Sequence, residues 1–179
     1  MTVAADGDLP ALVLSVPTGD DIDRIAEICQ EADIQEWTSI VRGYQRSDAE
    51  FFVEQVVAKG WNEGRELTWA IREADAGASA HLVGMLGITL SGPEGARTGE
   101  VGYWLAAAAR GRGTMTRAVA ALIDMAFDSS GPLGLSALRW RCDIHETSHG
   151  PVPNWASWKV AWSLGFQREG RVRRFLPND

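Results

Sequence analysis

A short run of arginine and glycine gives the chain its clearest chemical signal. The turn 110–113 (RGRG) precedes a segment whose apolar residues between 119 and 127 recur at i, i+3, i+4, i+7 and i+8, which predicts an amphipathic helix. The start of a helix leaves backbone N–H groups unpaired at the positive end of the helix dipole and is a ready anion site. No acidic residue lies between Glu100 and Asp124, although the formal net charge is −7. The turn therefore predicts a site for a phosphate-bearing ligand.

Composition limits the classes of protein that could carry this turn. The chain has 179 residues, of which 45% are hydrophobic, enough for one domain over 9–179 that follows a flexible tail at 1–8. A pI near 5.0 argues against a nucleic-acid partner. The sequence contains no apolar run of membrane-spanning length, and its two cysteines show no metal-binding or CxxC spacing. These features predict a cytoplasmic protein that acts without nucleic acid, membrane or metal.

The elements around the turn can be placed from periodicity and capping residues. They follow the order β-α-α-β-β-β-α-β-α-β. The predicted strands cover residues 9–16, 66–72, 81–90, 99–105, 138–142 and 166–175. Helices are expected over 22–29, after an N-cap at Ser47 with Glu50 in a capping box, after Gly113, and over 154–164, the last one buried because it is apolar nearly all round. Segments 33–45 and 144–153 are expected to be irregular.

Three blocks in this order resemble the GNAT superfamily of N-acetyltransferases, and in particular its RimJ/RimL-like branch. Block 100–105 (EVGYWL) is similar to the fourth strand of that branch, and 110–115 (RGRGTM) is similar to its pyrophosphate loop. Block 154–157 (NWAS), followed by 164–166 (LGF), is similar to its second cofactor helix. The resemblance implies an α/β (α+β) fold with a mixed, mostly antiparallel sheet flanked by helices. The fourth and fifth strands would splay apart into a slot for acetyl-coenzyme A or another acyl-coenzyme A.

The resemblance also implies which residues bind the acyl-coenzyme A. Strand backbone would pair with the pantetheine arm, loop N–H groups would hold the pyrophosphate, and Asn154 would bond the pantetheine. The residues implied are Tyr103, Trp104, Leu105, Arg110, Arg112, Gly113, Thr114, Met115, Asn154 and Ser157. Met115 stands where the family has glycine or alanine, which is tolerable if its side chain points away from the phosphates. Asn154 could instead serve only as a helix N-cap.

The implied reaction is the attack of a neutral amine on a thioester carbonyl. Ser157 would donate a hydrogen bond to the leaving thiolate, and a backbone N–H near Trp104 would stabilise the oxyanion. An alkyl ammonium has a pKa of ~10.4, so a base must take its proton. Glu100 is the first candidate base, directly or through water, with Asp143 and His145 as rivals. Glu100 and Ser157 could also be ordinary surface and helix residues. The acceptor would be an amine on a protein N-terminus or a small molecule.

Other readings stay open beside this one. Residues 145–149 match H-E-x-x-H, the pattern of a zinc hydrolase with His145, Glu146 and His149, but nearby Gly150, Pro151 and Pro153 disfavour the helix that this site requires. A module that binds acyl-coenzyme A without turnover is a further alternative. The family usually has one more strand after the last one predicted here, so a truncated chain, a shortened protein, or completion by a neighbouring chain, for example in a homodimer, is also open.

Overall fold

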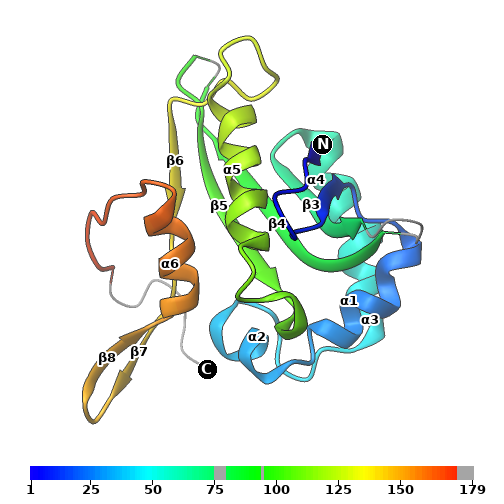
Figure 1. The fold of residues 1–179 in the computed structure, drawn as a ribbon, viewed down its shortest axis with the longest axis vertical. Coiled ribbons are helices and arrows are strands. Elements are labelled where there is room, and N and C mark those ends of the chain that lie inside the picture. Colours follow the sequence, from blue (N-terminus) through cyan, green and yellow to red (C-terminus); the bar gives the residue numbers. More distant parts are fainter. Residues whose placement is uncertain (75–79, 94, 173–179) are drawn as a thin grey trace.

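A six-stranded sheet forms the centre of the molecule (Figure 1). The computed structural model describes residues 1–74, 80–93 and 95–172. The strands lie in the order β1-β2-β3-β4-β5-β6, and only β5 and β6 are parallel. Their bounds are Thr2–Val3, Ala11–Ser15, Glu66–Ala74, His81–Ser91, Thr98–Leu105 and Ala137–Trp140. The predicted mixed, mostly antiparallel sheet is therefore confirmed.

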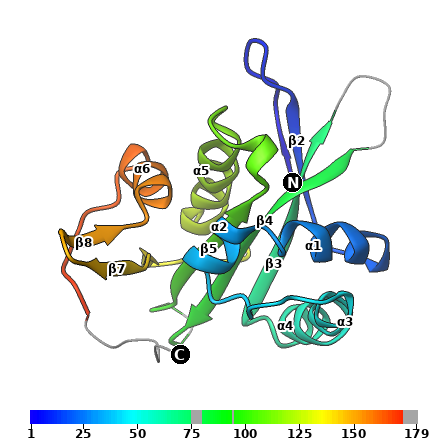
Figure 2. The same ribbon diagram turned by 90° about the horizontal axis from the view of Figure 1, so that it is seen from below.

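Helices cover both faces of this sheet. On one face, α1 (Ile22–Ile28) and α3 (Arg46–Phe51) pack on a buried cluster; α3 continues through a π-helical turn (Phe52–Val57) into α4 (Ala58–Glu63). On the other face, α5 (Thr114–Phe127) packs with the sheet around a second cluster that includes Leu12, Ile71 and Leu122, and α6 (Trp155–Ser163) lies beside it. Figure 2 shows these two layers with the sheet between them. Burial of each large aliphatic side chain favours folding by about 1.5–3 kcal/mol.

Strands β5 and β6 pair over only part of their length. Their register runs from Thr98 opposite Ala137 to Val101 opposite Trp140. Strand β5 goes on to Leu105, still paired with β4. The two parallel strands therefore part after Val101, and the last four residues of β5 leave one edge without a partner strand.

The first residues of the chain differ from the expected loose tail. Thr2 and Val3 form β1, which pairs with β2 opposite Val13 and Leu12. The amino group of Met1 donates a hydrogen bond to the carbonyl of Leu14. The guanidinium of Arg117 in α5 donates to the backbone carbonyls of Ala4 and Pro10. Contacts from both a strand and a helix thus hold the segment on the domain.

Two helical boundaries also differ from the prediction. Segment 33–45 was expected to be irregular, but Ala32–Trp37 forms α2. Helix α3 begins after Gln45 and not after Ser47, because Asp48 accepts the Gln45 N–H at 2.7 Å and completes the capping pattern two residues earlier.

Gly60 lies within α4, where a Cβ would stand 2.1 Å from the Glu66 carbonyl oxygen. Its missing side chain lets the helix approach β3.

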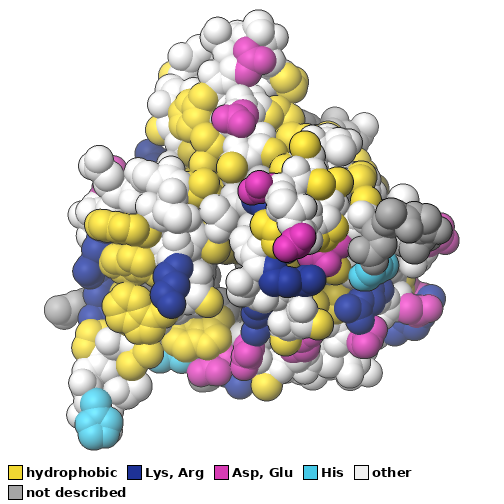
Figure 3. All heavy atoms as spheres, viewed as in Figure 1, with side chains coloured by type: hydrophobic (Ala, Val, Ile, Leu, Met, Phe, Trp, Pro, Cys, Tyr) yellow, Lys and Arg dark blue, Asp and Glu magenta, His cyan; other side chains and the backbone are white. Residues whose placement is uncertain are grey.

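The end of the described chain departs further from expectation. Segment 144–153 is a hairpin of β7 (Ile144–Thr147) and β8 (Gly150–Pro153), not an irregular loop. Helix α6 was predicted to be buried, yet Trp155 and Trp162 are 57% and 65% exposed, and Figure 3 shows hydrophobic side chains gathered over this helix. Trp155 and Trp162 are thus exposed, whereas Trp158 packs edge-on against Trp140 of β6, so the apolar character of the helix did not signal burial all round. Residues 166–172 form no strand, and the rest of the predicted strand lies outside the described residues.

Candidate active site

Three side chains meet where β5 and β6 part. Ser157 of α6 donates a hydrogen bond from Oγ to the Tyr103 hydroxyl at 3.2 Å, and that hydroxyl donates to the Ser157 carbonyl at 3.1 Å. The indole Nε1 of Trp140 donates to Ser157 Oγ at 3.1 Å. Burial raises the pKa of Tyr103 to about 12 despite its hydrogen bonds with Ser157 and Trp140, so the phenol stays protonated at neutral pH. We call the point after Val101 where β5 and β6 part the fork. The fork therefore holds a connected set of neutral hydrogen-bond donors.

Asn154 fixes the start of the helix that carries Ser157. Its side-chain oxygen accepts the Ser157 backbone N–H at 3.0 Å, the standard N-cap contact. Its own N–H donates to the carbonyl of Asp143 at 3.1 Å. Asn154 is therefore an N-cap, one of the two roles left open by the sequence, and the amide nitrogen of its side chain is still available to a ligand.

The arginine and glycine turn has the backbone shape of an anion site. Gly111 and Gly113 adopt φ values of +76° and +77°, the left-handed region that glycine enters without a steric penalty. Gly113 is the N-cap of α5, which runs for 14 residues from Thr114. A Cβ at Gly113 would meet no heavy atom within 4 Å, so this side of the turn is open. Backbone N–H groups of the first helical turn can therefore face a ligand there.

The side chains of this turn point to other partners. The Arg112 guanidinium and the Thr114 hydroxyl both reach the Glu73 carboxylate on β3 at 3.0 Å. Thr114 and Glu73 are buried, and Met115 is buried in the core beneath α5. Met115 thus points away from the open side of the turn. Thr114 and Met115 therefore offer only their backbone to a phosphate, whereas the half-exposed Arg112 guanidinium keeps donors beyond the nitrogen that it gives to Glu73.

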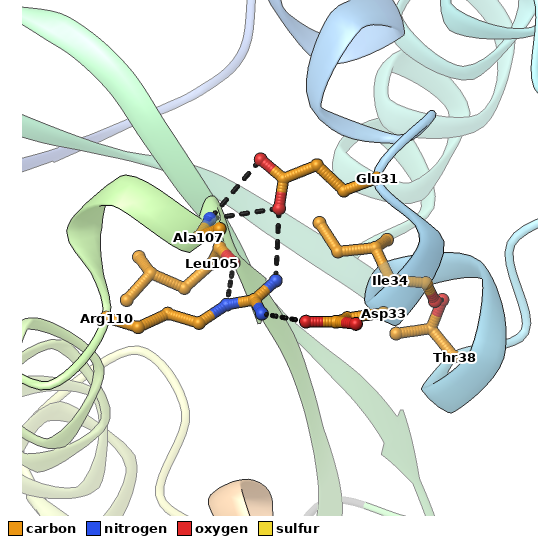
Figure 4. A network of polar contacts seen from close by, with 7 residues as sticks. All are labelled: Glu31, Asp33, Ile34, Thr38, Leu105, Ala107 and Arg110. Carbon is orange, nitrogen blue, oxygen red and sulfur yellow. Dashed lines mark hydrogen bonds and ion pairs between the residues drawn. The ribbon is translucent and has the colours of Figure 1, made fainter.

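Arg110 is the clearest difference from the expected site (Figure 4). Its Nε donates to the Leu105 carbonyl at 2.9 Å, and its terminal nitrogens pair with Asp33 at 2.8 Å and Glu31 at 3.1 Å. The Glu31 carboxylate also accepts the Ala107 N–H at 2.9 Å. The guanidinium thus joins the end of β5 to α2 and does not point into the turn. Sequence reasoning missed Glu31 and Asp33, since no local pattern marks a partner so distant in the chain.

Glu100 lies in the paired part of β5, opposite Arg139 of β6. Its carboxylate forms an ion pair with Arg141, with Nε at 2.8 Å. Both arginines and Glu100 line a polar pocket of about 230 Å³ together with Thr89, Ser91, Thr98 and Gly99. The structure does not place Glu100 in the hydrogen-bonded group around Ser157.

His145, the rival base, belongs to a contact between the hairpin and α2. Its ring stacks on Trp37 with centroids 4.0 Å apart and an interplanar angle of 7°. Its Nδ1 lies 3.5 Å from the Glu36 carboxylate. The hairpin is thereby attached to α2, across from the end of β5.

The H-E-x-x-H pattern does not form a zinc-hydrolase helix. His145 and Glu146 lie on β7, and His149 lies in the turn that follows. The two histidines therefore do not share a helical face. Among residues 1–74, 80–93 and 95–172, no three His, Cys, Asp or Glu side chains gather where they could hold a metal ion. The zinc-hydrolase reading is wrong on this geometry.

A mixed sheet that forks between its parallel strands, with a glycine-capped helix on one side of the fork, defines a GNAT-type acetyltransferase fold. Residues 11–167 match the acetyltransferase (GNAT) domain family, and the chain belongs to that family. No curated protein matches the chain. No helix in the described part of the chain is long and apolar enough to cross a membrane.

Solved structures support the same fold. RimJ from Mycobacterium smegmatis, in complex with a coenzyme A disulfide, is 20% identical over 95% of this chain and 77% of its own, with a TM-score of 0.75. The ribosomal-protein-S5-alanine acetyltransferase from Vibrio fischeri is 18% identical over 98% and 88%, with a TM-score of 0.73. The Salmonella typhimurium enzyme that modifies the N-terminal serine of ribosomal protein L7/L12 is 15% identical over 100% and 92%, with a TM-score of 0.74.

Proposed function

We propose that the protein is an acetyl-coenzyme A-dependent N-acetyltransferase. It moves an acetyl group to a primary amine of a protein N-terminus or a small molecule, by direct attack in a ternary complex. The observation that carries this proposal is the fork between β5 and β6, which has the Ser157 hydroxyl on one side and the open turn at Gly113 on the other. The RimJ structure with a coenzyme A disulfide supports the cofactor, and the two ribosomal-protein enzymes support an amine acceptor.

The residues of the fork fit the cofactor. The Tyr103 backbone and the Leu105 N–H face the edge of β5 that has no partner strand and can pair with the pantetheine arm, whereas the Trp104 backbone faces Met85 of β4. The Leu105 carbonyl accepts Arg110 Nε and keeps one further acceptor position. The N–H groups from Gly113 to Met115 suit the pyrophosphate, and the Asn154 side chain can add a donor. Acetyl-coenzyme A supplies the activated thioester carbonyl.

The chain's own groups can carry out the remaining steps. A backbone N–H near Trp104 stabilises the developing oxyanion, and the Ser157 hydroxyl donates toward the leaving sulfur. Glu100 takes the amine proton directly or through water, which requires its carboxylate to keep a lone pair free beside Arg141. A carboxylate can do this because its two oxygens offer about four acceptor positions.

Incubation with acetyl-coenzyme A and a panel of amines tests the proposal. The panel contains peptides with free N-termini, the same peptides with blocked N-termini, and small primary amines. Mass spectrometry is expected to find an acetyl group on at least one free amine and none on the blocked peptides. Binding of coenzyme A without transfer to any acceptor would favour a binding module instead.

A further inference from the structure

The Ser157 hydroxyl is held by two side chains that the assigned chemistry does not use. Trp140 lies on β6 and Tyr103 on β5, so each strand of the fork places one polar side chain against the Ser157 hydroxyl on α6: Trp140 donates to it and Tyr103 accepts from it. All three residues are partly buried. The Trp140 ring is further supported by an edge contact with Trp158, with centroids 6.3 Å apart. The orientation of the Ser157 side chain is therefore set by both arms of the fork.

The hydrogens in this group can be arranged in two ways. A serine hydroxyl has one proton to donate and two acceptor positions, whereas an indole N–H can only donate. In the structure Ser157 gives its proton to Tyr103, and Tyr103 gives its own to the Ser157 carbonyl. If both hydroxyls rotate, Tyr103 donates to Ser157 Oγ across the same 3.2 Å. The Ser157 proton can then point at an acceptor in the slot without any movement of heavy atoms.

We propose that Tyr103 and Trp140 are positioning residues that make Ser157 a stronger hydrogen-bond donor to the sulfur of coenzyme A. An oxygen that accepts two hydrogen bonds holds its own proton less tightly, because linked hydrogen bonds polarise one another. Trp140 supplies the first of these bonds in both arrangements, and Tyr103 supplies the second after rotation. This inference rests on the proposed function, since it needs coenzyme A in the fork.

The protonation state of the phenol supports a role for its hydroxyl. Burial keeps Tyr103 protonated, so it has a proton to donate throughout the neutral and mildly alkaline range. A phenylalanine would fill the same volume and lose only the hydroxyl. The hydroxyl can therefore be tested separately from the ring.

The test measures the acidity of the coenzyme A thiol in its binary complex, which needs no acceptor. The ultraviolet absorbance of the thiolate is titrated with pH, relative to the protein alone, for the wild type and four variants. Ser157→Ala is expected to weaken the acidity of the bound thiol by about tenfold, the effect of one hydrogen bond to a charged group. Tyr103→Phe and Trp140→Phe are expected to weaken it by about threefold each. Tyr44→Phe, at the chain's other tyrosine, which is buried under α1 and α3, should leave it unchanged.

The pattern of results separates the possible outcomes. Adding Tyr103→Phe to Ser157→Ala should cause no further change, because the proposed effect passes through the serine. If Tyr103→Phe and Trp140→Phe bind coenzyme A with wild-type thiol acidity, the positioning role is overturned while the cofactor site stands. If the wild type does not bind coenzyme A by calorimetry, both this inference and the proposed function fail.

Discussion

At the scale of single residues, the candidate site depends on backbone that only certain residues can adopt. Gly113 combines a positive φ with open space on the side where its Cβ would stand. The neighbouring side chains of Arg112 and Thr114 are held by Glu73, a buried carboxylate on β3. The turn is thus shaped by contacts behind it and leaves its N–H groups available in front. Its binding capacity should be sensitive to changes at Gly113 itself.

Gly113→Glu is expected to abolish coenzyme A binding, because it places bulk and negative charge where the pyrophosphate would lie. Isothermal titration calorimetry measures the dissociation constant. Gly64→Glu is the matched control, since Gly64 also has a positive φ with open space around it but caps α4. Each substitution costs about 1 kcal/mol of backbone strain, and only Gly113→Glu should lose binding. Equal binding by both variants would refute the assignment of the turn.

Arg110→Ala tests whether this arginine holds the cofactor or the fold. The contacts of Arg110 with Leu105, Glu31 and Asp33 predict a loss of about 1–2 kcal/mol in the free energy of unfolding, reduced by partial exposure of the ion pairs. The dissociation constant for coenzyme A should change less than about threefold. A direct phosphate contact would instead weaken binding by more than about tenfold. Asp33→Ala, which removes one of the same ion pairs, should also leave the dissociation constant unchanged.

At the scale of elements, the hairpin β7–β8 is inserted in the chain between β6 and α6. The Asn154 N–H donates to the Asp143 carbonyl, so the hairpin begins and ends at one backbone contact. A further contact near the base of the hairpin is the stack of His145 on Trp37 in α2. We expect the hairpin to form a wall of the acceptor site, since it can do so without shaping β6 or α6. This position suggests a role in acceptor choice.

Replacing residues 145–152 with an Asn-Gly turn should keep the domain folded, since this dipeptide suits a two-residue hairpin connection. We expect the dissociation constant for coenzyme A to stay within about twofold and the KM for the acceptor to rise about tenfold, the effect of losing about 1.4 kcal/mol of contact. Steady-state kinetics with the best amine of the panel checks this. An unchanged acceptor KM would remove the hairpin from the acceptor site.

Elements were predictable where one local pattern determines them. The strand before the turn, the turn itself and α5 were placed correctly because alternation, paired glycines and helical periodicity are local signals. Helix α2 and the β1 strand were missed, because each is short and depends on contacts with distant segments. The ion-pair partners of Arg110 and the Tyr103 partner of Ser157 lie more than fifty residues away in the chain, and a single sequence does not show such pairs.

At the scale of the whole molecule, the free energy of folding depends on a buried ion pair between Asp21, just before α1, and Arg72 of β3. Asp21 accepts two hydrogen bonds at 2.7 Å from Arg72, whose Nε also donates to Ser15. Burial by itself would raise the pKa of Asp21. The hydrogen bonds from Arg72 and from the Thr18 backbone, with the charge of Arg72, outweigh burial and lower it below 3.8.

The lowered pKa of Asp21 gives a prediction for acid unfolding. Its contribution to stability is fully present above the unfolded-state pKa, near 3.8, and is lost as the pH falls through the lower folded-state value. Asp21→Asn should lower the free energy of unfolding by about 3 kcal/mol at neutral pH, because it leaves Arg72 without its charged partner. This loss should shrink as the pH falls below the unfolded-state pKa of Asp21. Denaturant titrations at several pH values measure this, with the exposed Asp20→Asn as control. A cost for Asp21→Asn that does not vary with pH would contradict the argument.

The central claim is that the protein transfers an acetyl group to an amine at the fork between β5 and β6, with the help of Ser157. Its most direct test is the rate of acetyl transfer to the best amine of the panel at saturating acetyl-coenzyme A, for the wild type and Ser157→Ala. We predict a rate lower by about tenfold to a hundredfold in the variant, with the dissociation constant for coenzyme A changed less than about threefold. Equal rates for both proteins would contradict the role of Ser157, and no transfer by the wild type to any amine would contradict the claim itself.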